Sequence, residues 1–134
     1  MSEIVIGHKG TLHLRVDEED RGPDGTAAYL TVTADLDCLH AEKKIYDVDG
    51  FRHLLSYFEE LETNWRGWDD LKEFKSLEHD FRLSAKHIGY LRVFIELDAF
   101  DRLDPWAAKG EFVLDPGEEL TAAVEALRTF LGAR

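Results

Sequence analysis

The stretch that decides the fold is residues 49–65, which read DGFRHLLSYFEELETNW. Its apolar residues recur every three or four positions, as on one face of an α-helix, and they are Phe51, Leu54, Leu55, Phe58, Leu61 and Trp65. The opposite face carries Glu59, Glu60 and Glu62. This spacing predicts an amphipathic helix over about residues 49–64, with the carboxylate of Asp47 or Asp49 capping its start.

Upstream of this helix, apolar and polar residues alternate, which is the period of a half-buried strand. The alternation is clearest in Thr11–Val16, where Leu12, Leu14 and Val16 share a face. The same pattern predicts strands over residues 4–6, 28–36 and 39–46. Residues 17–25, DEEDRGPDG, hold five acids, one proline and two glycines, and they predict an exposed loop between strands.

Downstream of the helix the strand period returns. Residues 71–76 form one candidate strand, and residues 81–85 and 91–97 form a hairpin around the turn His87-Ile88-Gly89. A last strand places five residues on one face, namely Trp106, Ala108, Gly110, Phe112 and Leu114.

A closing helix follows the sequence DPGE at residues 115–118. Asp115 is expected to cap it, Pro116 to take its first position, and Glu118 to sit three residues after the cap. The expected buried stripe is Leu120, Ala123, Val124, Leu127, Phe130 and Leu131, and Gly132 should end the helix.

Together these elements predict a single α+β domain over residues 1–134. We expect an antiparallel sheet of six to eight strands with both amphipathic helices packed on its apolar face, because each apolar stripe needs a partner surface. The other face of the sheet would carry Arg15, Thr31, Thr33, Arg82, Ser84, Arg92 and Phe94.

The charge of the chain restricts its partners. Sixteen Lys and Arg stand against twenty-eight Asp and Glu, for a formal net charge of −12 over 134 residues. Such a charge repels nucleic acid and anionic membranes and attracts cationic partners. An apolar fraction of 44% favours a folded acidic protein over a disordered one. No long apolar run and no signal-peptide pattern are present, so we expect a cytoplasmic protein.

No residue pattern indicates catalysis, a cofactor or a metal. The six histidines lack metal-ligand spacing, so we interpret them as scattered surface or boundary residues. Cys38 and His40 lie on one side of a possible strand and could both ligate a metal, but we favour Cys38 as a small buried hydrophobe. Nucleophile and phosphate-binding motifs are also missing. We therefore predict a non-enzymatic protein without cofactor.

Two kinds of residue are candidates for binding a protein partner. The acidic candidates are Asp17, Glu18, Glu19 and Asp20, together with Asp98, Asp101 and Asp104. The second kind is the cluster Trp65-Arg66-Gly67-Trp68, because Trp and Arg are enriched at interface hot spots. Core packing is the competing interpretation, favoured for Trp65 as the end of the helix stripe and evenly balanced for Trp68.

The chain resembles a family of small, acidic, uncharacterised bacterial single-domain proteins, a domain of unknown function. The resemblance covers roughly residues 40–134, and more loosely the start. The matching elements are the helix ending in Trp65-Arg-Gly-Trp68, the segment Ser76-Leu-Glu-His-Asp80 with the strand after it, strand 90–97, Trp106, and Leu114-Asp-Pro-Gly-Glu118. It implies a fold but no catalytic residues. Proteins of this build are similar to immunity proteins of bacterial toxin systems, which is an analogy of architecture.

Three hypotheses about function follow. The first is a non-enzymatic acidic module that binds a basic protein, most simply an immunity protein that masks a toxin. The second is a small-molecule-binding or enzymatic domain with a pocket between sheet and helices. A homodimer through a sheet edge or the outer sheet face is compatible with either, and Tyr29 and Phe94 support it.

Overall fold

The computed structural model describes residues 2–132, which form eight strands and two α-helices. The first four strands are β1 (Ser2–Ile6), β2 (Thr11–Val16), β3 (Tyr29–Leu36) and β4 (Leu39–Tyr46), with a short 3-10 helix, η1 (Glu18–Asp20), after β2. Helix α1 (Arg52–Thr63) follows. The second four strands are β5 (Lys72–Lys75), β6 (Phe81–His87), β7 (Leu91–Asp98) and β8 (Ala107–Leu114), and helix α2 (Glu118–Phe130) closes the chain.

The α+β class predicted from the sequence is confirmed, but the eight strands form two sheets instead of one. The sheets have the orders β1-β2-β3-β4 and β5-β6-β7-β8, and every strand is antiparallel to its neighbour. Each sheet is therefore a meander of strands adjacent in sequence. Helix α1 lies between β4 and β5 in the sequence, and these two strands belong to different sheets.

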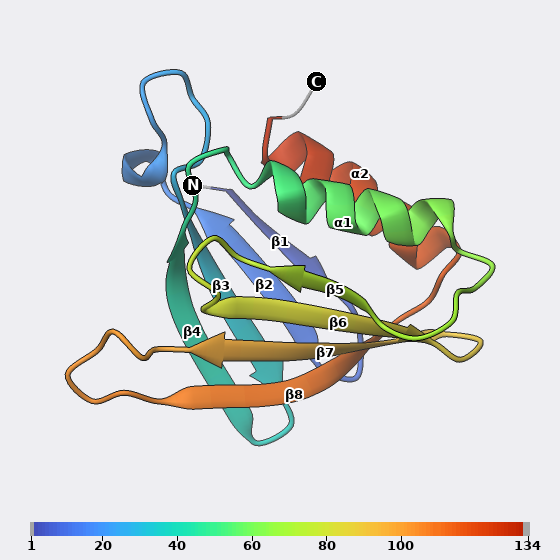
Figure 1. Cartoon of the computed structure of the whole chain (residues 1–134). Helices are drawn as coiled ribbons and strands as arrows, with labels where there is room; N and C mark the ends of the chain where they lie inside the picture. Colours follow the sequence, from blue (N-terminus) through green and yellow to red (C-terminus); the bar gives the residue numbers. More distant parts are fainter. Residues whose placement is uncertain (1, 133–134) are drawn as a thin grey trace.

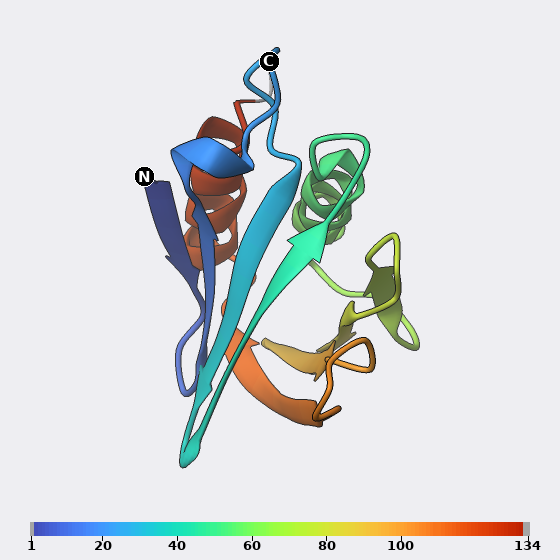
Figure 2. The ribbon, with the colours of Figure 1, turned by 90° about the vertical axis from the view of Figure 1, so that its left-hand side faces the viewer.

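The two sheets face each other, and the two helices lie side by side over the opening between them (Figures 1 and 2). Helix α2 contacts β1, helix α1 contacts β5, and the helices contact each other. On the other side β8 approaches β2 and β3. One hydrophobic core results, with buried side chains from both sheets and both helices, among them Leu14, Leu83, Phe58 and Leu127. The two helices thus pack against both sheets, whereas the sequence predicted that both would pack on one face of one sheet.

The β1–β2 turn is fixed against β8. His8 and Val113 exchange two backbone hydrogen bonds of 2.9 Å. Gly7 has a φ of +94°, and a side chain there would overlap the ring of Phe112, which is fully buried. A glycine is needed at this position both for the backbone conformation and for the close approach of the two sheets.

Helix α1 begins three residues later than predicted. Phe51 precedes it in a left-handed conformation (φ 63°), and its backbone N–H donates to the Asp47 carboxylate at 2.7 Å. Asp47 therefore satisfies backbone donors ahead of the helix, but the N-cap is Phe51 and, within the described residues, neither Asp47 nor Asp49 caps the helix with its side chain, so the predicted capping is wrong. The predicted apolar stripe is buried from Phe51 to Leu61, but its last member, Trp65, is exposed. Tyr57 joins the buried face and donates its hydroxyl to the carbonyl of Lys72 at 2.9 Å.

The capping predicted for the closing helix is wrong. Helix α2 begins at Glu118 with Gly117 as its N-cap, and within residues 2–132 no side chain, that of Asp115 included, caps it. Instead, the Glu119 carboxylate reaches back and accepts the backbone N–H of Asp115 at 2.6 Å. The predicted buried stripe and the end of the helix are confirmed, with Gly132 in a left-handed conformation (φ 70°).

Candidate protein-binding surfaces at two ends of the fold

The candidate binding residues predicted from the sequence lie at two opposite ends of the molecule. Residues 17–20 and the loop after β7 lie at the left-hand end in Figure 1, whereas the loop after α1 lies at the right-hand end. The structure does not bring the ten residues together into one surface. We call the left-hand end, comprising residues 17–20 and 98–106, the acidic end.

The first acidic segment is only partly available to a partner. Asp20 is 3% exposed, which differs from the exposed loop that the sequence predicts. Its carboxylate accepts hydrogen bonds from Lys44 Nζ at 2.8 Å and from the backbone N–H of Asp17 at 3.2 Å. The hydrogen bond to Asp20 raises the pKa of Lys44. Glu18 and Glu19 are exposed, and their side chains form no ion pair within residues 2–132. These two acids are therefore the accessible ones.

The second acidic segment exposes apolar side chains between its acids. The backbone N–H of Ala99 donates to the carbonyl of Trp106 at 2.8 Å and closes the loop between β7 and β8. Within this loop Phe100 is 59% exposed, Leu103 is fully exposed and Trp106 is 37% exposed. Large apolar side chains gathered on a surface loop are a recurrent mark of protein interaction sites. The sequence analysis singled out the acids of this segment and did not identify Phe100 and Leu103 as exposed.

The three acids of this segment, Asp98 at the end of β7 and Asp101 and Asp104 in the loop, differ in their contacts. Asp98 lies 4.0 Å from the Arg82 guanidinium, and Asp101 lies 3.5 Å from Lys43 Nζ. Asp104 is exposed and forms no ion pair with the described residues. Asp101 thus holds the loop to β4, while Asp104 remains accessible to a partner.

Strand β4 lies between the two acidic segments and contacts both. Lys44 points outward and pairs with Asp20, whereas Lys43 points inward and pairs with Asp80 at 3.0 Å and with Asp101 at 3.5 Å. Consecutive residues of a strand point to opposite faces, so the two lysines reach opposite sides of the sheet. The positions of both acidic segments are therefore tied to one strand.

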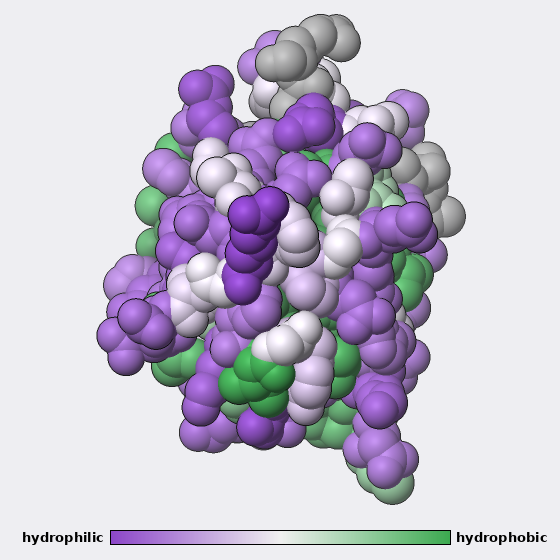
Figure 3. All heavy atoms as spheres, turned by 90° about the vertical axis from the view of Figure 1, so that its right-hand side faces the viewer, coloured by the Kyte–Doolittle hydropathy of each residue, from purple (hydrophilic) through white to green (hydrophobic). Residues whose placement is uncertain are grey.

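The Trp65–Trp68 segment divides into one exposed and one structural tryptophan. Trp65 is 48% exposed, with the Arg66 guanidinium 5.1 Å from its ring centroid. Trp68 packs against the core, donates its Nε1–H to the carbonyl of Ala85 at 3.2 Å, and meets the His87 ring edge to face. Figure 3, which views this end, shows a hydrophobic patch within a largely hydrophilic surface. Ile88 and Tyr90 add exposed apolar area to this end.

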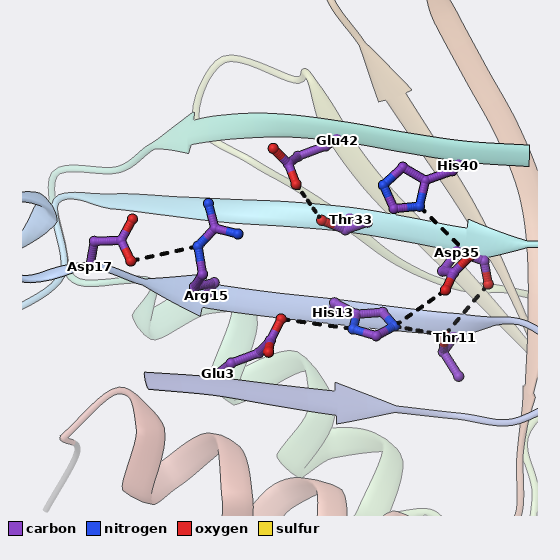
Figure 4. Close-up of polar contacts among 9 residues, drawn as sticks. All are labelled: Glu3, Thr11, His13, Arg15, Asp17, Thr33, Asp35, His40 and Glu42. Atoms are coloured by element: carbon purple, nitrogen blue, oxygen red, sulfur yellow. Dashed lines mark hydrogen bonds and ion pairs between the residues drawn. The ribbon is translucent and has the colours of Figure 1, made fainter. Parts of the chain in front are cut away.

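The outer face of the first sheet carries a network of polar side chains (Figure 4). His13 Nε2 and the Thr11 hydroxyl share a hydrogen bond of 2.9 Å. His13 also lies 3.8 Å from the Asp35 carboxylate, and His40 lies 3.7 Å from the same carboxylate. These histidine–carboxylate distances exceed hydrogen-bond length, and the residues stand on an open sheet face. The expectation that Cys38 is buried is wrong, because Cys38 lies exposed in the β3–β4 turn.

A third group of polar residues joins segments more than one hundred positions apart. His8, Asp115 and Glu119 place one potential ligand atom each within 4.8 Å of one another, which sequence spacing gave no signal for. His8 Nδ1 lies 3.0 Å from both Glu119 oxygens, and Glu119 also accepts the N–H of Asp115. These contacts account for the cluster as a clamp between the β1–β2 turn and α2.

The hollows of the molecule bear on the alternative of an internal pocket. A small, partly open hollow of about 80 Å³ lies between the start of α1 and β5, lined by Asp47, Phe51, His53, Leu54 and Ser76 among others. It has room for a few water molecules, whereas ligand pockets typically measure about 300–1,000 Å³. A larger hollow of about 500 Å³ beside Phe94 is shallow and lies on the outer surface, and another of about 540 Å³ lies between α1 and α2, lined by Leu55, Glu59 and Arg128 among others.

Within residues 2–132, neither α-helix has the length and apolar character needed to cross a lipid bilayer.

Comparison with known proteins gives one result. No curated protein and no solved structure shows significant similarity to the chain. A model of a family of unknown function, DUF6228, matches residues 5–134 and so extends well before the region in which the sequence resemblance was clearest. Because the match spans nearly the whole chain, the protein belongs to the DUF6228 family.

Proposed function

We propose that this chain is a non-enzymatic module that binds a basic protein through its acidic end. The observation that carries the proposal is the β7–β8 loop, where the exposed side chains of Phe100, Leu103 and Trp106 alternate with Asp101 and Asp104. Apolar anchors surrounded by charge are the usual composition of a protein interface, in which a few buried anchors supply most of the affinity.

Charge and apolar contacts would have separate roles in such an interface. A net charge of −12 attracts a basic partner over long range and raises the association rate. Phe100 and Leu103, once buried in the partner, would slow dissociation. Glu18, Glu19 and Asp104 are the acids best placed to meet cations, because their charges are not used in ion pairs within the described residues.

The simplest partner is a basic bacterial toxin, which the chain would mask as an immunity protein in the cytoplasm. The support for this is the acidity, the small size and the build of the domain. A toxin must be neutralised before it reaches its target, so fast electrostatic association would favour protection.

The test uses the purified products of the genes that flank the coding gene, because toxin and immunity genes are neighbours by necessity. We expect one basic product to bind and to lose its toxicity when both proteins are co-expressed. The triple variant Glu18→Gln, Glu19→Gln, Asp104→Asn should lower the association rate and flatten its salt dependence. Leu103→Ala and Phe100→Ala should instead raise the dissociation rate, about tenfold or more for a hot-spot residue.

Matched controls lie at the opposite end of the molecule. Asp69→Asn, Asp70→Asn and Glu118→Gln together remove the same three charges from exposed positions, and Ile88→Ala removes an exposed apolar side chain. These controls should leave the dissociation rate unchanged, and they should lower the association rate less than the triple variant at Glu18, Glu19 and Asp104 does. Binding that responds equally to both sets would contradict the acidic end as the interface. If no flanking product binds or is neutralised, the toxin-masking role is wrong.

A further inference from the structure

The outer face of the second sheet differs in charge from the rest of the molecule. The residues of β5–β8 that point away from the core include five cations and four acids, namely Lys75, Arg82, Lys86, Arg92 and Lys109 with Glu73, Glu96, Asp98 and Glu111. The whole chain has sixteen cations and twenty-eight acids. The negative charge of the protein is therefore concentrated elsewhere, and this face is close to neutral.

The same face has an apolar projection beside a hollow. Phe94 is partly exposed at the middle of β7, with the Arg92 guanidinium 5.2 Å from its ring centroid. Its neighbour in register on β6 is the small residue Ser84. A shallow hollow of about 500 Å³ extends over this position, with Leu71, which is 49% exposed, in its lining. A ring next to a hollow of this kind is a shape that a second copy of itself can complement.

We infer that this face is the contact between two copies of the chain, related by a twofold axis, with Phe94 of each copy placed in the hollow over Ser84 of the other. A twofold contact brings the same patch of both copies together. Two molecules that each carry −12 repel one another, so a contact between them is least unfavourable where charges are balanced. This inference goes beyond the proposed function, because it leaves Glu18, Glu19 and the β7–β8 loop outside the contact.

The ion pairs on the face also suit self-association. Arg82 pairs with Glu96 at 2.7 Å and Arg92 pairs with Glu111 at 2.8 Å, which neutralises the centre of the face. Lys75, Lys86 and Lys109 form no ion pair within the described residues, while the exposed acids Asp69 and Asp70 immediately precede Leu71 at the rim. Lysines on the face of one copy can therefore meet rim acids of the other.

The size of the face sets the strength expected. Strands β6, β7 and β8 have seven or eight residues and β5 has four. At a spacing of about 4.8 Å they outline at most roughly 15 Å by 25 Å, below the ~800 Å² per partner of a standard stable interface. We therefore expect a weak dimer that forms as the protein concentration rises. Its repulsive charge also means that added salt should strengthen it by screening.

Sedimentation equilibrium on the full chain, over micromolar to millimolar concentrations and at low and moderate salt, tests the inference. The mass should rise from that of the 15.4 kDa monomer toward twice that value, and more readily at moderate salt. Phe94→Ala should weaken the dimer about tenfold or more, and Ser84→Arg, which fills the hollow, should abolish it. Tyr29→Ala and Val5→Ala, on the outer face of the first sheet, are the matched controls and should change nothing.

Circular dichroism establishes that each variant is folded before its mass is interpreted. If Phe94→Ala does not fold, Phe94→Leu replaces it in the experiment. A protein that stays monomeric up to about millimolar concentration overturns the inference. A dimer that is insensitive to Phe94 and Ser84, or that responds to Tyr29 and Val5 instead, also overturns it. None of these outcomes depends on whether a basic partner binds the acidic end.

Discussion

Lys43 Nζ on β4 lies 3.0 Å from Asp80 Oδ2 in the turn between β5 and β6, and both side chains are buried. This ion pair links the first sheet to the second. Ser76 completes the network by donating its hydroxyl to Asp80 at 2.7 Å and accepting the N–H of Phe81 at 3.0 Å. A buried carboxylate held by a cation and a hydroxyl is stable only while its partners remain.

Removing the cation alone should therefore be costly. We expect Lys43→Met to lower the free energy of unfolding by about 3–5 kcal/mol, because Asp80 is left buried without its counter-charge. The double variant Lys43→Met, Asp80→Asn should recover much of this loss. Urea denaturation measures both, with the exposed Lys86→Met as control. Equal losses in the single and the double variant would show that the ion pair is not the cause.

The buried face of α1 gives a prediction about the core. Leu54→Ala or Phe58→Ala should lower the free energy of unfolding by about 2–5 kcal/mol, since both side chains are fully buried between the sheets and α2. Leu103→Ala, at a fully exposed position, should change it by less than about 0.5 kcal/mol. A loss below about 1 kcal/mol at Leu54 and Phe58 would mean that α1 packs less deeply than described.

The start of α2 reverses an expectation drawn from the sequence. Glu119→Ala should cost about 1 kcal/mol, because Glu119 accepts the N–H of Asp115 and contacts His8. Asp115→Ala should cost little, since the Asp115 side chain makes no cap bond. Thermal and urea denaturation of the two variants decide between them, and a larger loss at Asp115 would restore the sequence-based cap.

Two threonines on the outer face of the first sheet form a matched pair. The Thr31 hydroxyl is buried without a hydrogen-bond partner in the described part of the chain, whereas the Thr33 hydroxyl donates to Glu42 at 3.1 Å. Thr31→Val should leave stability unchanged or raise it by up to about 1 kcal/mol, because an unpaired polar group is replaced by an apolar one of the same shape. Thr33→Val should lose about 0.5–1.5 kcal/mol. A loss at Thr31 equal to that at Thr33 would contradict this difference.

Glu96 gives the stability a defined pH dependence. The hydrogen bond from Arg82 is the main cause that lowers the pKa of Glu96 below its ordinary value of 4.5. The folded state therefore binds the proton less readily than the unfolded state, so this stabilisation is present above pH 4.5 and is lost as the pH falls through the lowered pKa. Urea denaturation of wild type and Glu96→Gln should show a difference at neutral pH that disappears in acid. A difference that grows in acid would contradict the pairing.

Much of the fold could be predicted, because the spacing of apolar residues shows which side of a strand or helix is buried. The alternation in Thr11–Val16 and Leu91–Asp98 fixed which residues point inward, and the spacing in α1 fixed its buried stripe. The division into two sheets could not be predicted, because alternation does not say which strands pair. The burial of Lys43 could not be predicted either. Lys43 occupies an inward position between Ala41 and Ile45, where a lysine is tolerated only because Asp80 of the other half of the chain pairs with it.

The candidate site was predictable in composition but not in arrangement. The acids at 17–20 and 98–104 are visible in the sequence, yet the burial of Asp20 depends on Lys44, twenty-four positions away. Similarly, Trp68 is structural because the carbonyl of Ala85 accepts its N–H, a contact that no local pattern announces. Leu103 belongs to no strand or helix pattern of the sequence, so its exposure becomes apparent only once the loop is placed.

The arrangement of the strands as two consecutive meanders has a consequence for how the chain folds. All strand pairs within a sheet join neighbours in sequence, so each half can form from short-range contacts, which is the condition for rapid folding. Contacts between the halves join residues far apart in sequence, and they include the shared hydrophobic core, the helix pair, the backbone bridge from His8 to Val113, and the buried ion pair of Lys43 and Asp80. We therefore expect assembly of the two halves to be slower than strand pairing within them, and a cut in the loop after α1 would separate the chain between the two sets of paired strands.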